Sequence, residues 1–325
     1  MHHLAMFGNL TSIELCAGGG GQALGVEKAG FQHLAVVELN KHAAQTLRDN
    51  RPEWNVVEED LKTWSASDFK GVDLLAAGLP CPPFSKAGKQ LGDQDERNLF
   101  PAAFRIIKEC RPSAIMIENV RGLLDAVFLD FRSQFQKQLK RIGYESDWKL
   151  FNASDFGVPQ LRPRVVFVAM KKDLFPHFEW PEPTVTKRTT VGKSLYPLMS
   201  SCGWKGAKEW AKNADEIAPT LVGGSFKHGG PDLGPTRAKR AWAELGVNAI
   251  SLANEPPPPD YVGMPRLTVE MCAVLQGFPT SWKFSGKKTN AYRQVGNAFP
   301  PPVAEAVALK IKEAFASSAQ LQLAI

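Results

Sequence analysis

Short apolar segments of β type alternate with segments of helix type through the first half of this chain, and this alternation limits the folds that it can adopt. Because the apolar segments show no polar alternation, we expect strands buried on both faces, as in a parallel sheet covered by helices. The predicted fold class is therefore α/β, with a Rossmann-like doubly wound and mostly parallel sheet. The expected strands span residues 12–17, 34–38, 72–77, 114–118 and 164–169, and the expected helices span residues 22–29, 41–50, 99–110 and 131–142.

The regular alternation ends near residue 171. Residues 173–265 contain many prolines and glycines, which predict loops and a smaller, irregular domain. Val303, Val307 and Ile311 then recur every four residues, as on one face of a helix, and we expect this helix to dock on the first domain. The 325 residues thus divide into a first domain at 1–175, an irregular domain at 176–280, and a hinge with a C-terminal segment at 281–325.

The composition is that of an ordinary globular protein, with 44% hydrophobic and 22% charged residues. The 39 Lys and Arg residues exceed the 33 Asp and Glu residues by six, which is compatible with a polyanion partner without demonstrating one. No apolar run approaches the roughly 18 residues of a membrane span, and the N-terminus shows no signal-peptide pattern. Five cysteines without a CxxC pair predict a reduced, cytoplasmic protein that binds no metal and contacts no membrane.

A run of glycines follows the first expected strand. Gly18 to Gly21 can form a tight turn that lets a ligand approach the backbone at a helix N-terminus. Glu38 ends the second expected strand, where its carboxylate can accept hydrogen bonds from two ribose hydroxyls. Asp60, near the end of a third strand, could bind an adenine amino group or could be an ordinary carboxylate of a surface turn. Together these residues favour a nucleoside-bearing cofactor, without distinguishing a nicotinamide dinucleotide from S-adenosylmethionine.

A cysteine between prolines follows the strand expected at residues 72–77. Pro80 and Pro82 stiffen the backbone on either side of Cys81, at the strand end where ligands bind in open parallel sheets. A cysteine held in this way is a candidate nucleophile. The segment that follows, at residues 86–98, is polar and contains glycines, which is typical of a mobile lid. The other cysteines are expected to be small buried residues, and they are Cys16, Cys110, Cys202 and Cys272.

Further segments of the chain match, in order, the motifs of a known family. The matching segments are IELCAGGGGQALG (13–25), VVELN (36–40), GLPCPPFS (78–85), IENV (117–120), QLRPR (160–164), RLTVEMCAVLQGFP (266–279) and AYRQVGNAFPPPVA (291–304). On these segments the chain resembles the cytosine-5 DNA methyltransferase family of prokaryotic restriction-modification systems. The match leaves out only about residues 175–265, where that family keeps its variable target recognition domain.

The resemblance implies transfer of a methyl group from S-adenosylmethionine to carbon 5 of a cytosine flipped out of a specific double-stranded DNA sequence, with S-adenosylhomocysteine as the other product. By motif position, Cys81 would add to carbon 6 of the ring and make carbon 5 nucleophilic. Glu118, protonated because of burial, would donate to ring nitrogen 3; the alternative for Glu118 is an ion pair within the apolar strand. Arg162 and Arg164 would hold the carbonyl oxygen, with Arg164 as the stronger candidate; the alternative for both is a surface salt bridge.

The same resemblance implies cofactor and DNA contacts. The implied cofactor-binding residues are Cys16, Ala17, Gly18, Gly20, Gly21, Glu38, Leu39, Asp60, Pro80, Leu99 and Asn297. Ser85 and Lys89 would close over the flipped base and its phosphates. In the irregular domain the candidate DNA-binding residues are Lys227, Arg237, Lys239 and Arg240, each of which could equally belong to a solvated basic face.

Four positions depart from the family pattern. Cys16 and Leu39 stand where the family usually has aromatic residues that pack near the adenine, and this predicts weaker cofactor binding. Glu14 replaces an aspartate and Pro82 replaces a glutamine. None of these changes removes a group that the chemistry needs.

Three alternative functions fit part of these features. A tRNA cytosine-5 methyltransferase belongs to the same family, and the size of the irregular domain and the PCPPFS loop favour DNA. A nicotinamide oxidoreductase would leave Cys81 and the QLRPR segment unexplained. The presence of Cys81 and Glu118 argues against an inactive DNA-binding relative. The resemblance further implies a cytoplasmic monomer associated with the nucleoid, and a restriction endonuclease that is a functional partner without stable contact.

Overall fold

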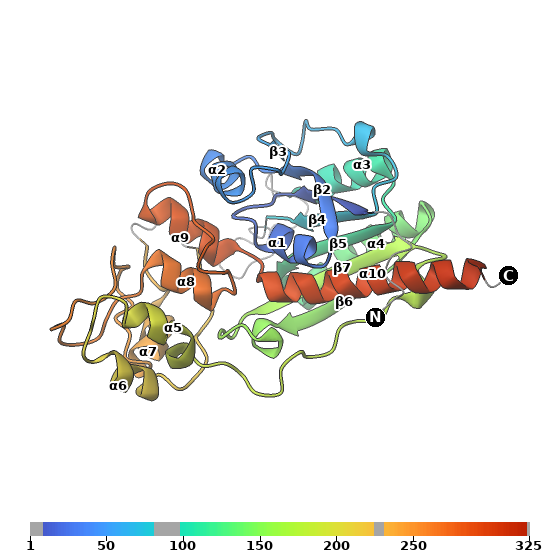
Figure 1. The fold of residues 1–325 in the computed structure, drawn as a ribbon. Helices are drawn as coiled ribbons and strands as arrows, with labels where there is room; N and C mark the ends of the chain where they lie inside the picture. Colours follow the sequence, from blue (N-terminus) through green and yellow to red (C-terminus); the bar gives the residue numbers. More distant parts are fainter. Residues whose placement is uncertain (1–8, 81–97, 224–230, 324–325) are drawn as a thin grey trace.

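The computed structural model describes residues 9–80, 98–223 and 231–323, and its centre is a seven-stranded sheet (Figure 1). The strand order is β3-β2-β1-β4-β5-β7-β6, and only β7 runs against its neighbours. The strands are β1 (Leu10–Leu15), β2 (Phe31–Val37), β3 (Val56–Val57), β4 (Leu74–Gly78), β5 (Ala114–Val120), β6 (Tyr144–Asn152) and β7 (Pro163–Lys171). This arrangement confirms the predicted α/β class and the mostly parallel sheet.

Helices cover both faces of the sheet, because its central strands are apolar on both sides. Leu75 and Ala77 of β4 face a core shared with α3 and α4, whereas Leu74 and Ala76 face a core shared with α10. The helices of this part are α1 (Gly21–Lys28), α2 (Lys41–Asn50), α3 (Phe100–Cys110), α4 (Leu129–Arg141) and α10 (Pro301–Leu323). Short 3₁₀ helices lie at Ser67–Phe69, Arg121–Leu124, Ala126–Phe128, Ala153–Phe156 and Phe175–His177.

Strand β6 was absent from the sequence prediction. It lies at the edge of the sheet, and polar or charged residues such as Ser146, Asp147 and Lys149 interrupt its apolar ones. An edge strand with one exposed face does not produce the wholly apolar run on which the prediction relied. The four predicted helices of the first half agree with α1 to α4 to within two residues at each end.

A second group of helices lies beside the sheet, and the chain returns from it through α9 (Lys288–Asn297) to α10 (Figure 1). This region was expected to be irregular, but it contains α5 (Val191–Met199), α6 (Ala207–Asn213), α7 (Thr236–Glu244) and α8 (Val269–Leu275). Trp204, Trp210 and Trp242 are buried in its core. Cys202, expected to be buried, is instead exposed in the turn after α5.

The C-terminal helix docks on the first domain as predicted. Val303, Val307 and Ile311 are buried in the core between α10 and the sheet. Helix α1 approaches α10 so closely that a Cβ on Gly25 would lie 2.5 Å from the Pro301 carbonyl oxygen. None of the helices in the described part of the chain is long and apolar enough to cross a membrane.

Candidate active site

The predicted site residues collect at one edge of the sheet. The parallel strands β1, β2, β4 and β5 end there, and β7 begins there because it runs in the opposite direction. This edge is where ligands bind in open α/β sheets. The described residues that it brings together are Cys16, Ala17, Gly18, Glu38, Leu39, Pro80, Glu118, Arg162 and Arg164.

The glycine run serves two purposes. Gly18 has a φ of 55°, and a Cβ there would meet none of the described residues within 4 Å, so this glycine leaves space beside its backbone among them. A Cβ on Gly20 would lie 2.7 Å from the Trp282 ring, and one on Gly21 would lie 2.2 Å from the Phe299 carbonyl oxygen. Gly20 and Gly21 therefore allow the C-terminal segment to pack on the loop, which the sequence prediction did not foresee.

Glu38 is held by the backbone around it. One carboxylate oxygen accepts a hydrogen bond from the Gly18 amide and the other accepts one from the Asn40 amide, each at 2.7 Å. Burial raises the pKa of Glu38, and these amides together with that of Leu39 oppose the rise. The carboxylate keeps accepting capacity that these amides do not use and that can receive a hydrogen bond from a hydroxyl group. The geometry therefore fits the predicted ribose contact.

Position 16 forms the turn that leads into the glycine run. Cys16 has a φ of 54°, which is uncommon for a residue other than glycine. Its side chain is partly buried, and burial raises the pKa of its thiol. Ala17 fixes the turn, because its amide donates to the Val37 carbonyl oxygen at 3.1 Å. Leu39, by contrast, is 62% exposed beside this turn.

A buried acid lies below this turn in β1. Glu14 is fully buried, and neither of its carboxylate oxygens has a hydrogen-bond partner in the described ranges of the chain. Burial raises its pKa well above the ordinary value, which favours the neutral form. The sequence identified Glu14 only as a departure from the family pattern.

Asp60 starts a tight turn after β3. Its backbone carbonyl oxygen accepts from the amides of Thr63 and Trp64 at 3.0 and 2.9 Å, and its side chain accepts from the Lys62 amide at 2.9 Å. The carboxylate therefore stabilises its own turn, as expected of a turn residue. It is partly exposed and retains lone pairs for a further donor.

Glu118 and Arg164 form a buried pair on β5 and β7. Arg164 Nε lies 2.8 Å from Glu118 Oε1, and the two side chains are 12% and 7% exposed. Burial raises the pKa of Glu118, whereas Arg164 and then Arg162 limit that rise. The site thus places a carboxyl group that tends to hold a proton beside a permanent cation.

Arg162 has a different environment. Its side chain is fully buried, and its two terminal nitrogens donate to the carbonyl oxygens of Leu221 at 2.7 Å, Gly296 at 2.8 Å and Ala298 at 3.0 Å. Its complete burial excludes the alternative of a surface salt bridge, whereas its contact with a cytosine stays a prediction. Arg162 connects the start of β7 to two segments from the second half of the chain.

Two glutamines that sequence reasoning missed extend this connection. Gln160 donates to Gln276 Oε1 at 2.7 Å and accepts from the Leu221 amide at 2.8 Å, and both glutamines are fully buried. Each lies in a matching family segment, but the residue type alone does not reveal such a contact. Buried amides that are satisfied in this way fix the segments they join.

Asn119 connects β5 to the chain that precedes the proposed nucleophile. Its Nδ2 donates to the Leu79 carbonyl oxygen at 3.2 Å, and Pro80, which follows, is half-buried. Cys81 is the next residue along the chain. The predicted residues that lie outside the described residues are Cys81, Ser85, Lys89 and Lys227.

The remaining cysteines differ in accessibility. Burial raises the pKa of Cys110 to about 12 and also raises that of Cys272, so both thiols stay neutral. Cys202 is exposed. No cluster of three metal-ligating side chains occurs in residues 9–80, 98–223 and 231–323.

The remaining predicted contacts within the described residues lie on helices or directly beside them. Arg237 and Arg240 are exposed on α7, whereas Lys239 is engaged with Asp232 at 2.7 Å. Asn297 is exposed at the end of α9, where a Cβ on Gly223 would come within 2.2 Å of its side-chain oxygen. The structure thus places Asn297 against Gly223, in the segment that precedes α7. Leu99 precedes α3 and is partly buried.

Comparison with known proteins identifies the family of this chain. The sequence matches the family model of C-5 cytosine-specific DNA methylases over residues 10–313. It is 52% identical over 307 residues to the Type II methyltransferase M.NgoMIV of Neisseria gonorrhoeae, covering 94% of this chain and 97% of that protein. It is 54% identical over 313 residues to the Type II methyltransferase M.NaeI of Lentzea aerocolonigenes, covering 94% and 75% respectively.

Solved structures share the fold. A putative DNA modification methyltransferase encoded within an E. coli prophage superposes with a TM-score of 0.66 at 22% identity, covering 94% of this chain and 99% of that one. A DNMT2 mutant of Spodoptera frugiperda gives a TM-score of 0.63 at 18% identity, with the same coverage. Because the family model spans nearly the whole chain, and because two relatives are more than half identical to it, the chain belongs to the C-5 cytosine-specific DNA methylase family and is a DNA cytosine-5-methyltransferase.

Proposed function

We propose that this enzyme methylates carbon 5 of a cytosine flipped out of a specific double-stranded DNA sequence, through a covalent bond between Cys81 and carbon 6 of the ring. The Cys81 thiolate adds to carbon 6, which makes carbon 5 nucleophilic. S-adenosylmethionine, when bound, supplies the electrophilic methyl group. Loss of the proton at carbon 5 and expulsion of the thiolate then restore the aromatic ring.

The buried pair of Glu118 and Arg164 carries this proposal. Its 2.8 Å contact lies on β5 and β7, at the sheet edge where β4 leads toward Cys81. A protonated Glu118 can donate to ring nitrogen 3, and Arg164 can donate to the carbonyl oxygen of the base. Both donors stabilise the negative charge that develops on the ring when the thiolate adds.

The residues at the ends of β1 and β2 fit S-adenosylmethionine. Among the described residues, Gly18 leaves space beside its backbone, and Glu38 faces it with accepting capacity for the ribose hydroxyls. Asp60 would accept from the adenine amino group. Leu39, Pro80 and the small Cys16 side chain would supply the remaining walls.

The region of about residues 175–265, which matches no family segment, is proposed to read the DNA sequence. The family segments that surround the site supply chemistry common to all members, so they cannot encode a particular sequence. Arg237 and Arg240 are exposed on α7 and are the candidates for DNA contact, whereas Lys239 would first have to leave Asp232. The enzyme is further proposed to act as a monomer in the cytoplasm, with a separate restriction endonuclease that shares its recognition sequence.

Trapping of the covalent adduct tests the mechanism. Plasmid DNA methylated by the enzyme is first sequenced after bisulfite treatment, which gives the target cytosine. A duplex with 5-fluorocytosine at that position should then form a stable adduct, because fluorine cannot leave as the proton does. Cys81→Ser should form no adduct, whereas Cys202→Ser, which alters an exposed cysteine, should form it normally. An adduct that maps to Cys202 or Cys110 would overturn the assignment.

A further inference from the structure

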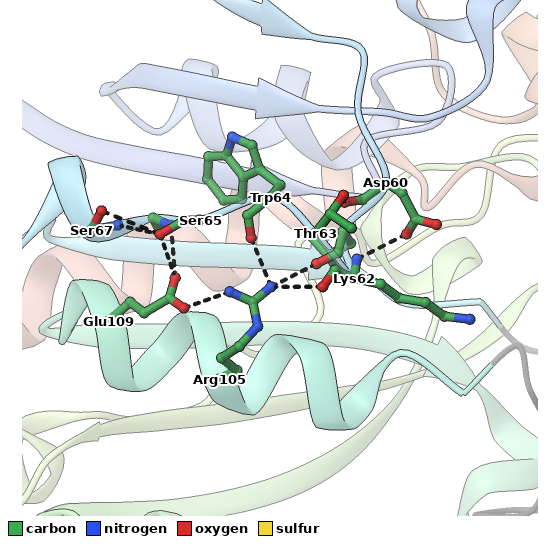
Figure 2. Close-up of polar contacts among 10 residues, drawn as sticks. Asp60, Lys62, Thr63, Trp64, Ser65, Ser67, Arg105 and Glu109 are labelled. Carbon is green, nitrogen blue, oxygen red and sulfur yellow. Dashed lines mark hydrogen bonds and ion pairs between the residues drawn. The ribbon is translucent and has the colours of Figure 1, made fainter.

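Arg105 of α3 reaches the turn that begins at Asp60 (Figure 2). Its Nη2 donates to the Leu61 carbonyl oxygen at 3.0 Å and to the Trp64 carbonyl oxygen at 2.7 Å, and a longer contact of 3.4 Å joins it to the Lys62 carbonyl oxygen. One guanidinium nitrogen therefore contacts three carbonyl groups of a single turn. Such carbonyl groups form the negative end of a helical turn, and a cation stabilises them there.

Glu109 holds the other side of the guanidinium and the chain that follows the turn. One oxygen lies 2.5 Å from Arg105 Nη1, one helical turn earlier in α3. The other oxygen accepts from the Ala66 amide at 2.9 Å and from the Ser65 hydroxyl at 3.1 Å. Burial opposes the ionisation of Glu109, but the Ala66 amide, Arg105 and Ser65 outweigh it and lower its pKa. The pair thus remains charged and binds the turn on both sides of Trp64.

On its N-terminal side the turn is also held by the buried Leu61 side chain and by the hydrogen bond from the Lys62 amide to the Asp60 carboxylate. Strand β3, which precedes it, spans only Val56–Val57. Trp64 anchors the far end, where it is buried and stacks on Phe69 at 5.8 Å between ring centroids. The direction of the Asp60 carboxylate also depends on how the carbonyl groups of its own turn are held.

We propose that Arg105, supported by Glu109, is a positioning residue for the cofactor: it fixes the turn so that Asp60 faces the amino group of the purine. This inference rests on the proposed function, in which Asp60 contacts the adenine. The placement of α3 supports this positioning role. Helix α3 begins directly after Leu99, which is another residue of the predicted cofactor pocket. Arg105 thereby fixes the position of Asp60 relative to Leu99.

Binding of two nucleoside probes tests the proposal without any turnover. S-adenosylhomocysteine carries the purine amino group, and S-inosylhomocysteine carries an oxygen in its place, which a carboxylate repels. We expect Arg105→Met to weaken S-adenosylhomocysteine binding about tenfold by calorimetry. Binding of S-inosylhomocysteine should change little, so that the preference between the two probes shrinks. Lys108→Met, an exposed lysine on the same helix, should keep the wild-type preference.

Two further variants keep the test decisive. Arg105→Lys and Glu109→Gln retain bulk and polarity, but neither can bind the carbonyl groups and the carboxylate at the same time. Each should therefore lose part of the preference for S-adenosylhomocysteine over S-inosylhomocysteine. This result is expected even if Arg105→Met does not fold. Equal weakening of both probes would indicate general destabilisation and would overturn the inference. Asp60→Ala distinguishes a failure of the positioning role of Arg105 from a failure of the proposed contact between Asp60 and the adenine. If Asp60→Ala removes the preference and the Arg105 variants keep it, only the positioning role fails; if Asp60→Ala keeps it, the adenine contact fails as well.

Discussion

The two sides of the site hold their carboxyl groups in different ways. On the proposed cofactor side, Glu38 accepts from the backbone amides of Gly18 and Asn40. On the proposed base side, Glu118 is held by a side chain, that of Arg164. A backbone donor is present whenever the turn forms, whatever residues build it, whereas a side-chain donor is present only if packing directs that side chain to the site. The base side is therefore expected to be the more sensitive to single substitutions.

The two arginines of the QLRPR segment illustrate this dependence. They have the same charge and lie two positions apart, yet Arg164 lies beside Glu118 while Arg162 donates to three carbonyl groups from distant segments. Arg162 precedes the first residue of β7, so the alternation of the strand does not fix its direction. The difference predicts that substitution of Arg164 impairs catalysis, whereas substitution of Arg162 lowers the stability of the fold.

Arg164→Ala should give the largest effect, a fall in kcat of about 100- to 1000-fold, because it removes a donor aimed at developing charge. Glu118 can hold a proton once Arg164 is absent, so the free energy of unfolding should fall less than in a variant that leaves buried carbonyl groups without a donor. Methyl transfer to plasmid DNA under saturating conditions measures the effect. Arg121→Ala, an exposed arginine in the 3₁₀ helix after β5, is the matched control and should retain activity. Equal losses in the two variants would remove Arg164 from the proposed mechanism.

Arg162→Met should lower the free energy of unfolding by about 3 kcal/mol, since it leaves buried carbonyl groups without a donor. Urea unfolding followed by tryptophan fluorescence measures the loss, with Arg164→Ala as the comparison. A variant of Arg162 that is as stable as the wild type but inactive would mean that Arg162 contacts the base, and the contrast between the two arginines would then be wrong.

Glu38→Ala should weaken S-adenosylmethionine binding by about 1.5–3 kcal/mol, the range for a hydrogen bond to a charged group. It also leaves the Gly18 amide without its acceptor. Affinity for DNA in the absence of cofactor should remain near the wild-type value. Glu59→Ala, an exposed carboxylate before the Asp60 turn, serves as control. Unchanged cofactor affinity in Glu38→Ala would mean that the cofactor binds elsewhere.

The fold was largely predictable because its signals are local. Apolar runs and turn residues predict β1, β4 and α1 to α4. Because the ends of parallel strands meet at one edge of the sheet, these elements also predict that Glu38 and Glu118 lie at that edge. The roles of Gly20, Gly21 and Arg162 were not predictable, because they come from contacts with residues far along the chain, such as Trp282, Phe299 and Leu221. No local sequence pattern predicts a contact between residues that are so far apart in the chain.

The buried Glu14 gives a smaller effect that depends on pH. Because its pKa is raised in the folded state, the folded protein keeps a proton that the unfolded chain loses, and stability falls as the pH rises from the ordinary carboxyl range through the raised pKa. Glu14→Gln cannot ionise, so it should gain about 1 kcal/mol relative to the wild type at pH 8. The gain should shrink at pH 5. Glu255→Gln, in an exposed loop, should show neither change, and a gain that is equal at both pH values would disprove this account.

Cys16→Phe tests the cofactor side with the smallest expected effect. The family usually has an aromatic residue here, and Cys16 is partly buried at the end of β1 with a φ of 54°. A ring at this position should add a face for the adenine and tighten S-adenosylhomocysteine binding by about 0.5–1.5 kcal/mol. The added bulk at a left-handed φ costs some stability, so binding is measured by calorimetry and unfolding separately. Cys202→Phe, which places a ring at an exposed cysteine, should leave binding unchanged. Weaker binding in Cys16→Phe would mean that the adenine does not lie over position 16, and that the purine is held instead between Leu99 and the turn of Asp60.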